Sequence, residues 1–93
     1  MPLDQNQATK LVVTDLATRL NVAESAVTVS STESTEFSNA CLDAAKTGEM
    51  CAQMMLRGWT LILSCQGKSY EYRAAKNQVR LFNFNGQNYK IYP

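Results

Sequence analysis

Histidine is absent from this chain of 93 residues. The sequence therefore lacks the usual general base and a common zinc ligand, and a Ser–His–Asp catalytic triad cannot form. Its four glycines are scattered, so no glycine-rich phosphate-binding loop exists. Carboxylate pairs such as Glu36 with Asp43 or Glu49 lie on polar segments, where solvation accounts for them. We expect no enzymatic activity, no cofactor and no metal.

Long apolar runs and strong net charge are also missing. No apolar run reaches the length of a membrane span, and residues 1–5 lack the basic start and apolar centre of a signal peptide. Residues 1–56 carry three basic and seven acidic side chains, whereas residues 57–93 carry six basic and one acidic. The net charge of +1 gives no reason to expect a membrane or a nucleic acid. The aromatic–glycine pattern of RNA-binding sheets is absent too, so we expect neither partner.

The apolar content of 45% is enough for one packed core, so residues 1–93 are expected to form a single domain. Residues 6–20 have the clearest helical period, with apolar side chains three and four positions apart at Ala8, Leu11, Val12, Leu16 and Leu20. Asp4 and Gln7 predict a capping box at the start of this helix, and Asn21 predicts a left-handed residue at its end.

From residue 26 the period changes to two, which predicts strands. We expect strands at residues 27–30 (fading into the polar run 31–36), 52–56, 59–65, 68–73, 79–84 and 88–92. Arg57–Gly58 is expected to form a turn, and Asn85–Gly86 is a strong hairpin signal. The predicted fold class is α+β, with one N-terminal helix packed on an antiparallel meander sheet of four to six strands.

The fifth of these strands carries apolar side chains in both alternations. Strict alternation places Val79 and Leu81 on one face and Phe82 and Phe84 on the other. A single helix covers only one face of a sheet. We therefore expect some aromatic surface to be exposed, or to be covered by the cysteine segment described next or by another molecule.

Cys41 and Cys51 frame a polar segment that fits neither helix nor strand. A bridge between them would fix this surface loop covalently and stabilise the fold by about 2–3 kcal/mol. The alternative is a pair of reduced thiols in a cytoplasmic protein. Cys65 is in phase with the apolar residues of its strand and is expected to be a buried free thiol.

Several short motifs resemble those of a family of small bacterial domains, frequent in cyanobacteria and mostly described as hypothetical or secreted. The matching residues lie within 8–82 and are Asp15–Ala17, Arg19–Leu20, Val27, Val29, Asn39–Leu42, Gly48–Glu49, Cys51–Gln53, Gly58–Trp59 and Tyr70–Arg73. The chain has Phe37 where the family usually has Trp, and Asp43 where it has Gly, at the turn after Leu42. The resemblance implies an exported domain with a bridged Cys41–Cys51 loop. Its signal peptide would then be absent from this chain, and a cytoplasmic location is the alternative.

These features favour a non-catalytic, exported protein-binding module. A helix on an antiparallel sheet with stiff loops is an architecture of small peptidase inhibitors such as the cystatin-like proteins, so inhibition of a peptidase by a rigid loop is its most concrete form. The expected partner-binding residues are Glu49, Met50, Phe82, Phe84, Asn85 and Gly86. The alternative function is a structural or assembly domain that homodimerises through the aromatic strand face.

Overall fold

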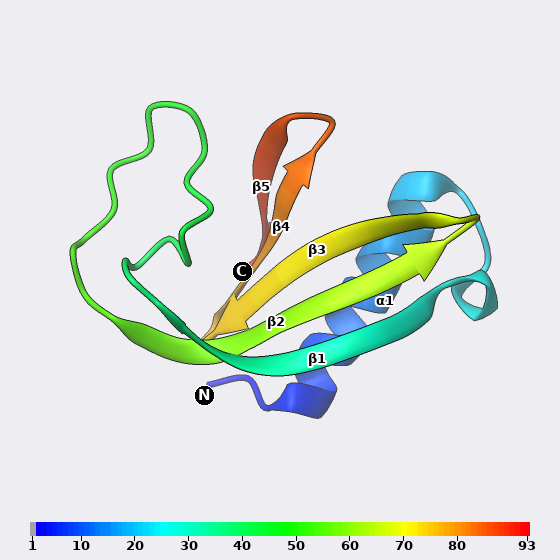
Figure 1. Ribbon diagram of the computed structural model, residues 1–93, viewed down its shortest axis with the longest axis horizontal. Helices are drawn as coiled ribbons and strands as arrows, with labels where there is room; N and C mark the ends of the chain where they lie inside the picture. Colours follow the sequence, from blue (N-terminus) through cyan, green and yellow to red (C-terminus); the bar gives the residue numbers. More distant parts are fainter. Residues whose placement is uncertain (1) are drawn as a thin grey trace.

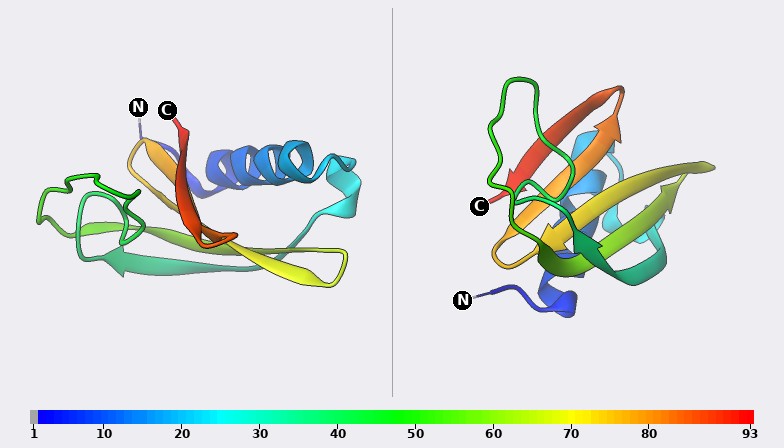
Figure 2. Two further views of the ribbon diagram at one scale, coloured as in Figure 1. Left: turned by 90° about the horizontal axis from the view of Figure 1, so that it is seen from above. Right: turned by 60° about the vertical axis from the view of Figure 1, so that its left-hand side comes forward.

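One helix lies on one face of a five-stranded sheet in the computed structural model, which describes residues 2–93 (Figures 1 and 2). The elements are α1 (Gln5–Leu20), a short 3-10 turn (Glu24–Ala26), β1 (Thr28–Phe37), β2 (Leu56–Cys65), β3 (Lys68–Ala75), β4 (Gln78–Phe84) and β5 (Gln87–Tyr92). Each strand pairs antiparallel with the next, in the order β1-β2-β3-β4-β5. The predicted α+β meander is confirmed. Within residues 2–93, no helix is long and apolar enough to cross a membrane.

The ends of α1 follow the signals in the sequence. An Asp4 carboxylate oxygen accepts the Gln7 N–H at 2.8 Å, and the Gln7 Oε1 accepts the Asp4 N–H at 3.0 Å, which completes the capping box. The helix ends at Asn21, which has a left-handed φ of 57°. The helix therefore begins one residue earlier than the period predicted.

The main core lies between α1 and the sheet. Its buried members are Ala8, Val12, Leu16, Leu61, Leu63, Tyr72, Ala74, Val79 and Leu81. The Tyr72 hydroxyl donates a hydrogen bond of 2.7 Å to Asp15 of the helix. Burial and the neighbouring Asp15 carboxylate both raise the pKa of Tyr72, so this phenol stays neutral. Cys65 is a buried free thiol, as expected.

Residues 38–55, here called the lobe, connect β1 to β2 without forming a strand. In Figure 1 the lobe projects on the left beside the β4–β5 hairpin. Its Leu42 packs in a second buried cluster with Phe37, Leu56 and Ala75. Ala75 follows the core residue Ala74 in β3, so alternation places this cluster on the face opposite α1. The lobe thus covers one end of the sheet face opposite α1. Cover by the cysteine segment was one of the alternatives that the sequence left open for this face.

Two predictions about the entry into β2 are wrong. Residues 52–55 form no strand, and Arg57–Gly58 lie within β2, paired with β1, rather than in a turn. Gly58 is buried, and a Cβ there would lie 2.8 Å from the Cα of Ala75. This glycine therefore allows close packing of neighbouring backbones, which the sequence alone does not distinguish from a turn. β1 also continues through the polar run 31–36, because an edge strand can leave polar side chains in water.

The prediction that Phe82 and Phe84 share a face is also wrong. The β4–β5 register shifts between Leu81 and Phe84, and Asn83 has a left-handed φ of 54°. This bulge breaks the alternation. Phe84 packs against the helix-side core, with its ring centroid 6.0 Å from that of Tyr70. Phe82 instead pairs with Glu71 of β3 and lies under the guanidinium of Arg73, 3.8 Å from its ring centroid.

Candidate functional site

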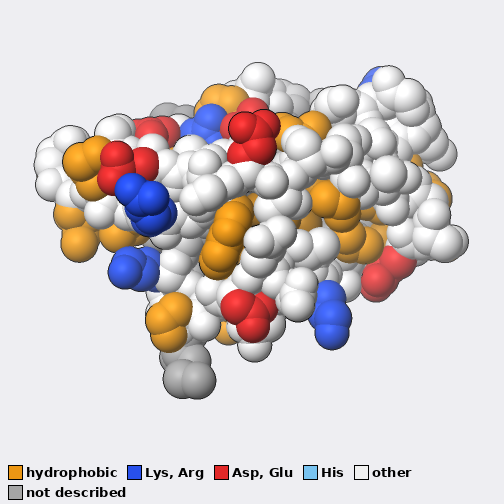
Figure 3. All heavy atoms as spheres, turned by 60° about the horizontal axis from the view of Figure 1, so that its bottom comes forward, with side chains coloured by type: hydrophobic (Ala, Val, Ile, Leu, Met, Phe, Trp, Pro, Cys, Tyr) orange, Lys and Arg blue, Asp and Glu red, His pale blue; other side chains and the backbone are white. Residues whose placement is uncertain are grey.

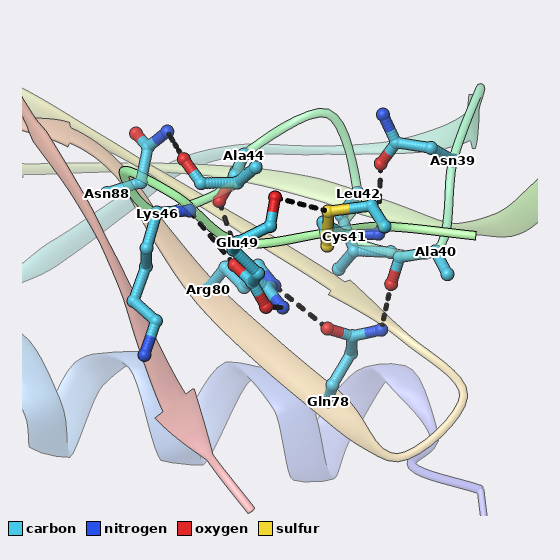
Figure 4. Close-up of polar contacts among 12 residues, drawn as sticks. Asn39, Ala40, Cys41, Leu42, Ala44, Lys46, Glu49, Gln78, Arg80 and Asn88 are labelled. Carbon is cyan, nitrogen blue, oxygen red and sulfur yellow. Dashed lines mark hydrogen bonds and ion pairs between the residues drawn. A yellow bond between two sulfur atoms is a disulfide. The ribbon is translucent and has the colours of Figure 1, made fainter. Parts of the chain in front are cut away.

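The lobe is closed by a disulfide between Cys41 and Cys51, whose Cα atoms are 5.6 Å apart. The predicted bridge is therefore present in the structure. Cys41 is buried, and its N–H donates a hydrogen bond of 2.9 Å to the Asn39 Oδ1 (Figure 4). Across the same narrow part of the lobe, the Ala40 N–H donates to the Ala52 carbonyl at 2.9 Å. The two ends of the lobe segment are thus held together at its base.

A buried arginine of β4 holds the middle of the lobe. Arg80 is 2% exposed, and its Nη1 and Nη2 donate to the two carboxylate oxygens of Glu49 at 2.6 and 2.7 Å. Its Nη1 also contacts the Ala44 carbonyl at 3.2 Å, and its Nε donates to the Gln78 Oε1 at 2.9 Å (Figure 4). The hydrogen bonds from Arg80 lower the pKa of Glu49 from its usual 4.5 to about 2. The ion pair is therefore fully formed at neutral pH.

Three further donors of the sheet bind carbonyl oxygens of the lobe. Gln78 Nε2 donates to Ala40 at 2.6 Å, and Asn88 Nδ2 donates to Ala45 at 2.8 Å. Arg73 Nη1 donates to Leu42 and Asp43 at 3.0 and 2.7 Å. Because these donors come from β3, β4 and β5, the inner side of the lobe is attached to three strands. Such a loop loses little conformational freedom when it binds a partner.

The turn after Leu42 is left-handed at two successive residues, with φ of 58° at Leu42 and 55° at Asp43. Glycine, which the resemblance places at position 43, adopts this conformation without strain, and Asp is among the residues that tolerate it. Asp43 stabilises it further, because its carboxylate accepts hydrogen bonds from the Ser38 hydroxyl and from the Ser38 N–H. These bonds lower the pKa of Asp43. Asp43 is therefore compatible with this turn.

The outer side of the lobe carries exposed methionines. Met50 is 95% exposed, Met55 64% and Met54 52%, and they are the exposed large hydrophobic residues of the described chain. Figure 3 shows hydrophobic side chains grouped at the left end of the molecule, where the lobe lies in Figure 1. The sequence pointed to Met50 but missed Met54 and Met55, because residues 52–56 are predicted as a short strand rather than as part of the exposed loop.

The remaining predicted site residues lie elsewhere. Asn85 and Gly86 form the tight turn of the β4–β5 hairpin, with φ of 52° and 82°, and both are exposed. Figures 1 and 2 show this hairpin and the lobe as separate projections.

Phe82 and Phe84 line a shallow hollow of about 240 Å³. The residues that line it are Ile62, Ser69, Tyr70, Glu71, Phe82, Asn83 and Phe84. The structure thus does not bring the six predicted residues into one surface.

One group of residues has the composition of a metal site. The sulfurs of Cys41 and Cys51 and a carboxylate oxygen of Glu49 lie within 4.8 Å of one another. Both sulfurs are joined in the disulfide, and Arg80 engages the carboxylate. Since thiolates rather than disulfide sulfurs bind metal ions, this arrangement does not fit a metal centre.

Comparison with known proteins gives a family but no activity. No curated protein matches the chain significantly. No solved structure matches it either. A family model described as "Domain of unknown function (DUF8738)" matches residues 9–82, which include α1 from its fifth residue, the lobe and the strands up to Phe82. The chain belongs to this family.

Proposed function

We propose that the protein is a non-catalytic, exported protein-binding module, and that it inhibits a peptidase through the lobe. The observation that carries this proposal is the contrast at Met50. Its side chain is 95% exposed, whereas the residues on both sides of it are fixed, Glu49 by Arg80 and Cys51 by the disulfide. An exposed apolar side chain on a stiff loop is the arrangement that a partner pocket can take up at low entropic cost.

Methionine suits such a contact. Its unbranched, polarisable side chain adapts to pockets of different shape, and methionines are common on protein-binding surfaces. Burying a side chain of this size removes apolar surface from water and contributes about 1.5–3 kcal/mol. Met54 and Met55 add exposed apolar area on the same segment of the chain, beside the point that the disulfide fixes.

Export is supported by the disulfide. Such bonds persist in oxidising compartments and are rare in the cytosol. This domain of 93 residues also benefits from the bridge, because small domains bury a limited fraction of their surface.

The alternative function is homodimerisation through the strand face that carries Phe82. In its favour, Ile62 and Phe82 are half-buried and line the shallow hollow, and none of the residues that line it belongs to the lobe. Against it, Phe84 also lines the hollow but packs against the helix-side core beyond the bulge at Asn83, so the two phenylalanines are not equally available to a partner. We therefore favour the lobe.

The test uses the oxidised protein against chymotrypsin, subtilisin, papain and pepsin. We expect stoichiometric inhibition of at least one of them, loss of that inhibition in Met50→Asp, and no change in Gln53→Asp. Gln53 is the matched control because it is exposed on the same segment and receives the same charge. Inhibition of none of these peptidases would contradict the inhibitor proposal. A concentration-dependent dimer in sedimentation, weakened by Phe82→Ser, would favour the alternative.

A further inference from the structure

We propose that the lobe is a substrate-like inhibitory loop whose reactive bond is Met50–Cys51, and that its target is a serine peptidase with a deep apolar primary pocket. This inference rests on the proposed function and names its partner class and contact point. Serine peptidases choose substrates largely by the side chain that enters this pocket, next to the bond that is cut. A pocket for a long, unbranched apolar side chain would accept Met50.

The residues around the bond have the required rigidity. On the N-terminal side, the Glu49 N–H donates to the Lys46 carbonyl at 2.9 Å, and the Glu49 carboxylate binds both Arg80 and the Lys46 N–H. On the C-terminal side, Cys51 is bonded to the buried Cys41. Among residues 2–93, no hydrogen bond engages the Met50 carbonyl oxygen, so a peptidase oxyanion hole could bind it.

The position of the disulfide distinguishes this bond from other exposed bonds of the chain. Met50–Cys51 lies inside the ring that the Cys41–Cys51 bridge closes, so cutting it leaves the two parts of the chain covalently connected. The new ends stay beside each other, because Arg80 holds Glu49 and the disulfide holds Cys51. Because the two new ends are held close together, their effective concentration for re-forming the peptide bond is high.

Other exposed bonds of the lobe fit less well. Lys46 lies in the same ring, but its carbonyl already accepts the Glu49 N–H and is unavailable to an oxyanion hole. Met54 and Met55 lie after Cys51, outside the ring, so a cut beside either would be held by neither the disulfide nor Arg80. Such a cut would behave as ordinary proteolysis.

The chemical step is that of the peptidase. Its serine Oγ attacks the Met50 carbonyl carbon, the bond to the Cys51 nitrogen breaks, and that nitrogen takes the proton carried by the peptidase histidine. The resulting acyl-enzyme has two fates. The retained Cys51 amine attacks it and restores the peptide bond, or one water molecule hydrolyses it and leaves a Met50 carboxylate. Because the amine is held in place, we expect the first fate to dominate.

The first experiment incubates the oxidised protein with catalytic amounts of chymotrypsin or subtilisin. We expect slow accumulation of a species heavier by one water molecule, which reduction separates into residues 1–50 and 51–93. This species should still inhibit fresh peptidase. Rapid cutting at Met50–Cys51 without inhibition would make the lobe a plain substrate and overturn the inference. Inhibition with first cleavage at another bond would also overturn it.

The second experiment changes the specificity. Trypsin requires a cationic side chain in its primary pocket, so Met50→Lys should inhibit trypsin at least 100-fold better than the parent and chymotrypsin correspondingly less. Gln53→Lys, which adds the same charge outside the ring, should leave the inhibition of trypsin and of chymotrypsin unchanged. If chymotrypsin or subtilisin is inhibited and Met50→Lys and Met50→Asp leave this inhibition intact, the module still functions but binds through another surface, such as the Asn85–Gly86 hairpin. If neither peptidase is inhibited and papain or pepsin is, the partner class named here is wrong while the proposed function stands.

Discussion

The ion pair between Glu49 and Arg80 offers the sharpest test of how the lobe is held. In Glu49→Gln the side chain keeps its size but loses its charge, so Arg80 loses its ion pair and one of its two acceptor oxygens, and an NH2 group faces its guanidinium instead. Arg80 is 2% exposed and would retain the Ala44 carbonyl and the Gln78 Oε1. Breaking a fully buried pair costs about 3–5 kcal/mol, and the partial exposure of Glu49 reduces this to about 1–3 kcal/mol.

The measurement is urea unfolding at pH 7, with Glu36→Gln as the matched control. Glu36 also pairs with an arginine, Arg57, but at 3.7 Å and with 49% and 76% of the two side chains exposed. Its loss should cost less than about 0.5 kcal/mol. If Glu49→Gln is no more destabilising than the control, the lobe is not held by this ion pair and the argument for its rigidity fails.

The same pair predicts a pH dependence. The pKa of Glu49 in the folded protein is about 2, below the usual 4.5, so folding favours the carboxylate form. The stability it contributes is fully present above about pH 5.5 and is lost as the pH falls toward 2. The difference in unfolding free energy between the parent and Glu49→Gln should therefore shrink over this range. A difference that stays constant from pH 7 to pH 3 would contradict the assigned ion pair.

Three further predictions concern the two sides of the sheet. Leu16→Ala should cost about 2–5 kcal/mol in a urea titration, because Leu16 is completely buried between helix and sheet; a loss below about 1 kcal/mol would mean that the helix does not dock as described. Tyr72→Phe removes the donor to Asp15 and should cost about 1 kcal/mol by the same measurement, whereas no change would show that the bond contributes nothing. Phe84→Ser should unfold at lower urea concentration than Phe82→Ser, because only Phe84 packs against the helix-side core; the reverse order would contradict the bulge between them.

Much of the fold could be predicted because its signals are local. The capping box at Asp4 and Gln7, the left-handed Asn21 and the Asn85–Gly86 turn each depend on residues within a few positions of one another. Each appears in the structure where the sequence placed it. The errors arose where a residue's role depends on distant neighbours. Position 58 requires glycine because the backbone of Ala75 lies too close for a side chain. The length of β1 depends on its pairing with β2.

The candidate site shows the same limit. The cysteine spacing indicated a loop, and the resemblance implied its bridge, but what holds the loop to the sheet was not visible. Glu49 and Arg80 are 31 positions apart, and the donors from Arg73, Gln78 and Asn88 lie 30 to 43 positions from the carbonyls they bind. Such contacts follow from the tertiary fold and leave no periodic pattern in the sequence.

The distribution of charge along the sequence nevertheless gave one indication of these contacts. The first 56 residues have an excess of acidic side chains and the rest an excess of basic ones. The structure joins the two parts through ion pairs between Glu49 and Arg80 and between Glu36 and Arg57. The segment that carries the acidic partners thus lies against the strands that carry the arginines. The charge asymmetry is therefore partly internal to the fold. The exposed side chains of Met50, Gln53, Met54 and Met55 in the second half of the lobe are uncharged, whereas Asp43 and Lys46 in its first half are charged and exposed. A partner that contacts Met50 and the methionines after it meets an uncharged surface, so these contacts depend on shape and apolar area, which agrees with the apolar pocket inferred above.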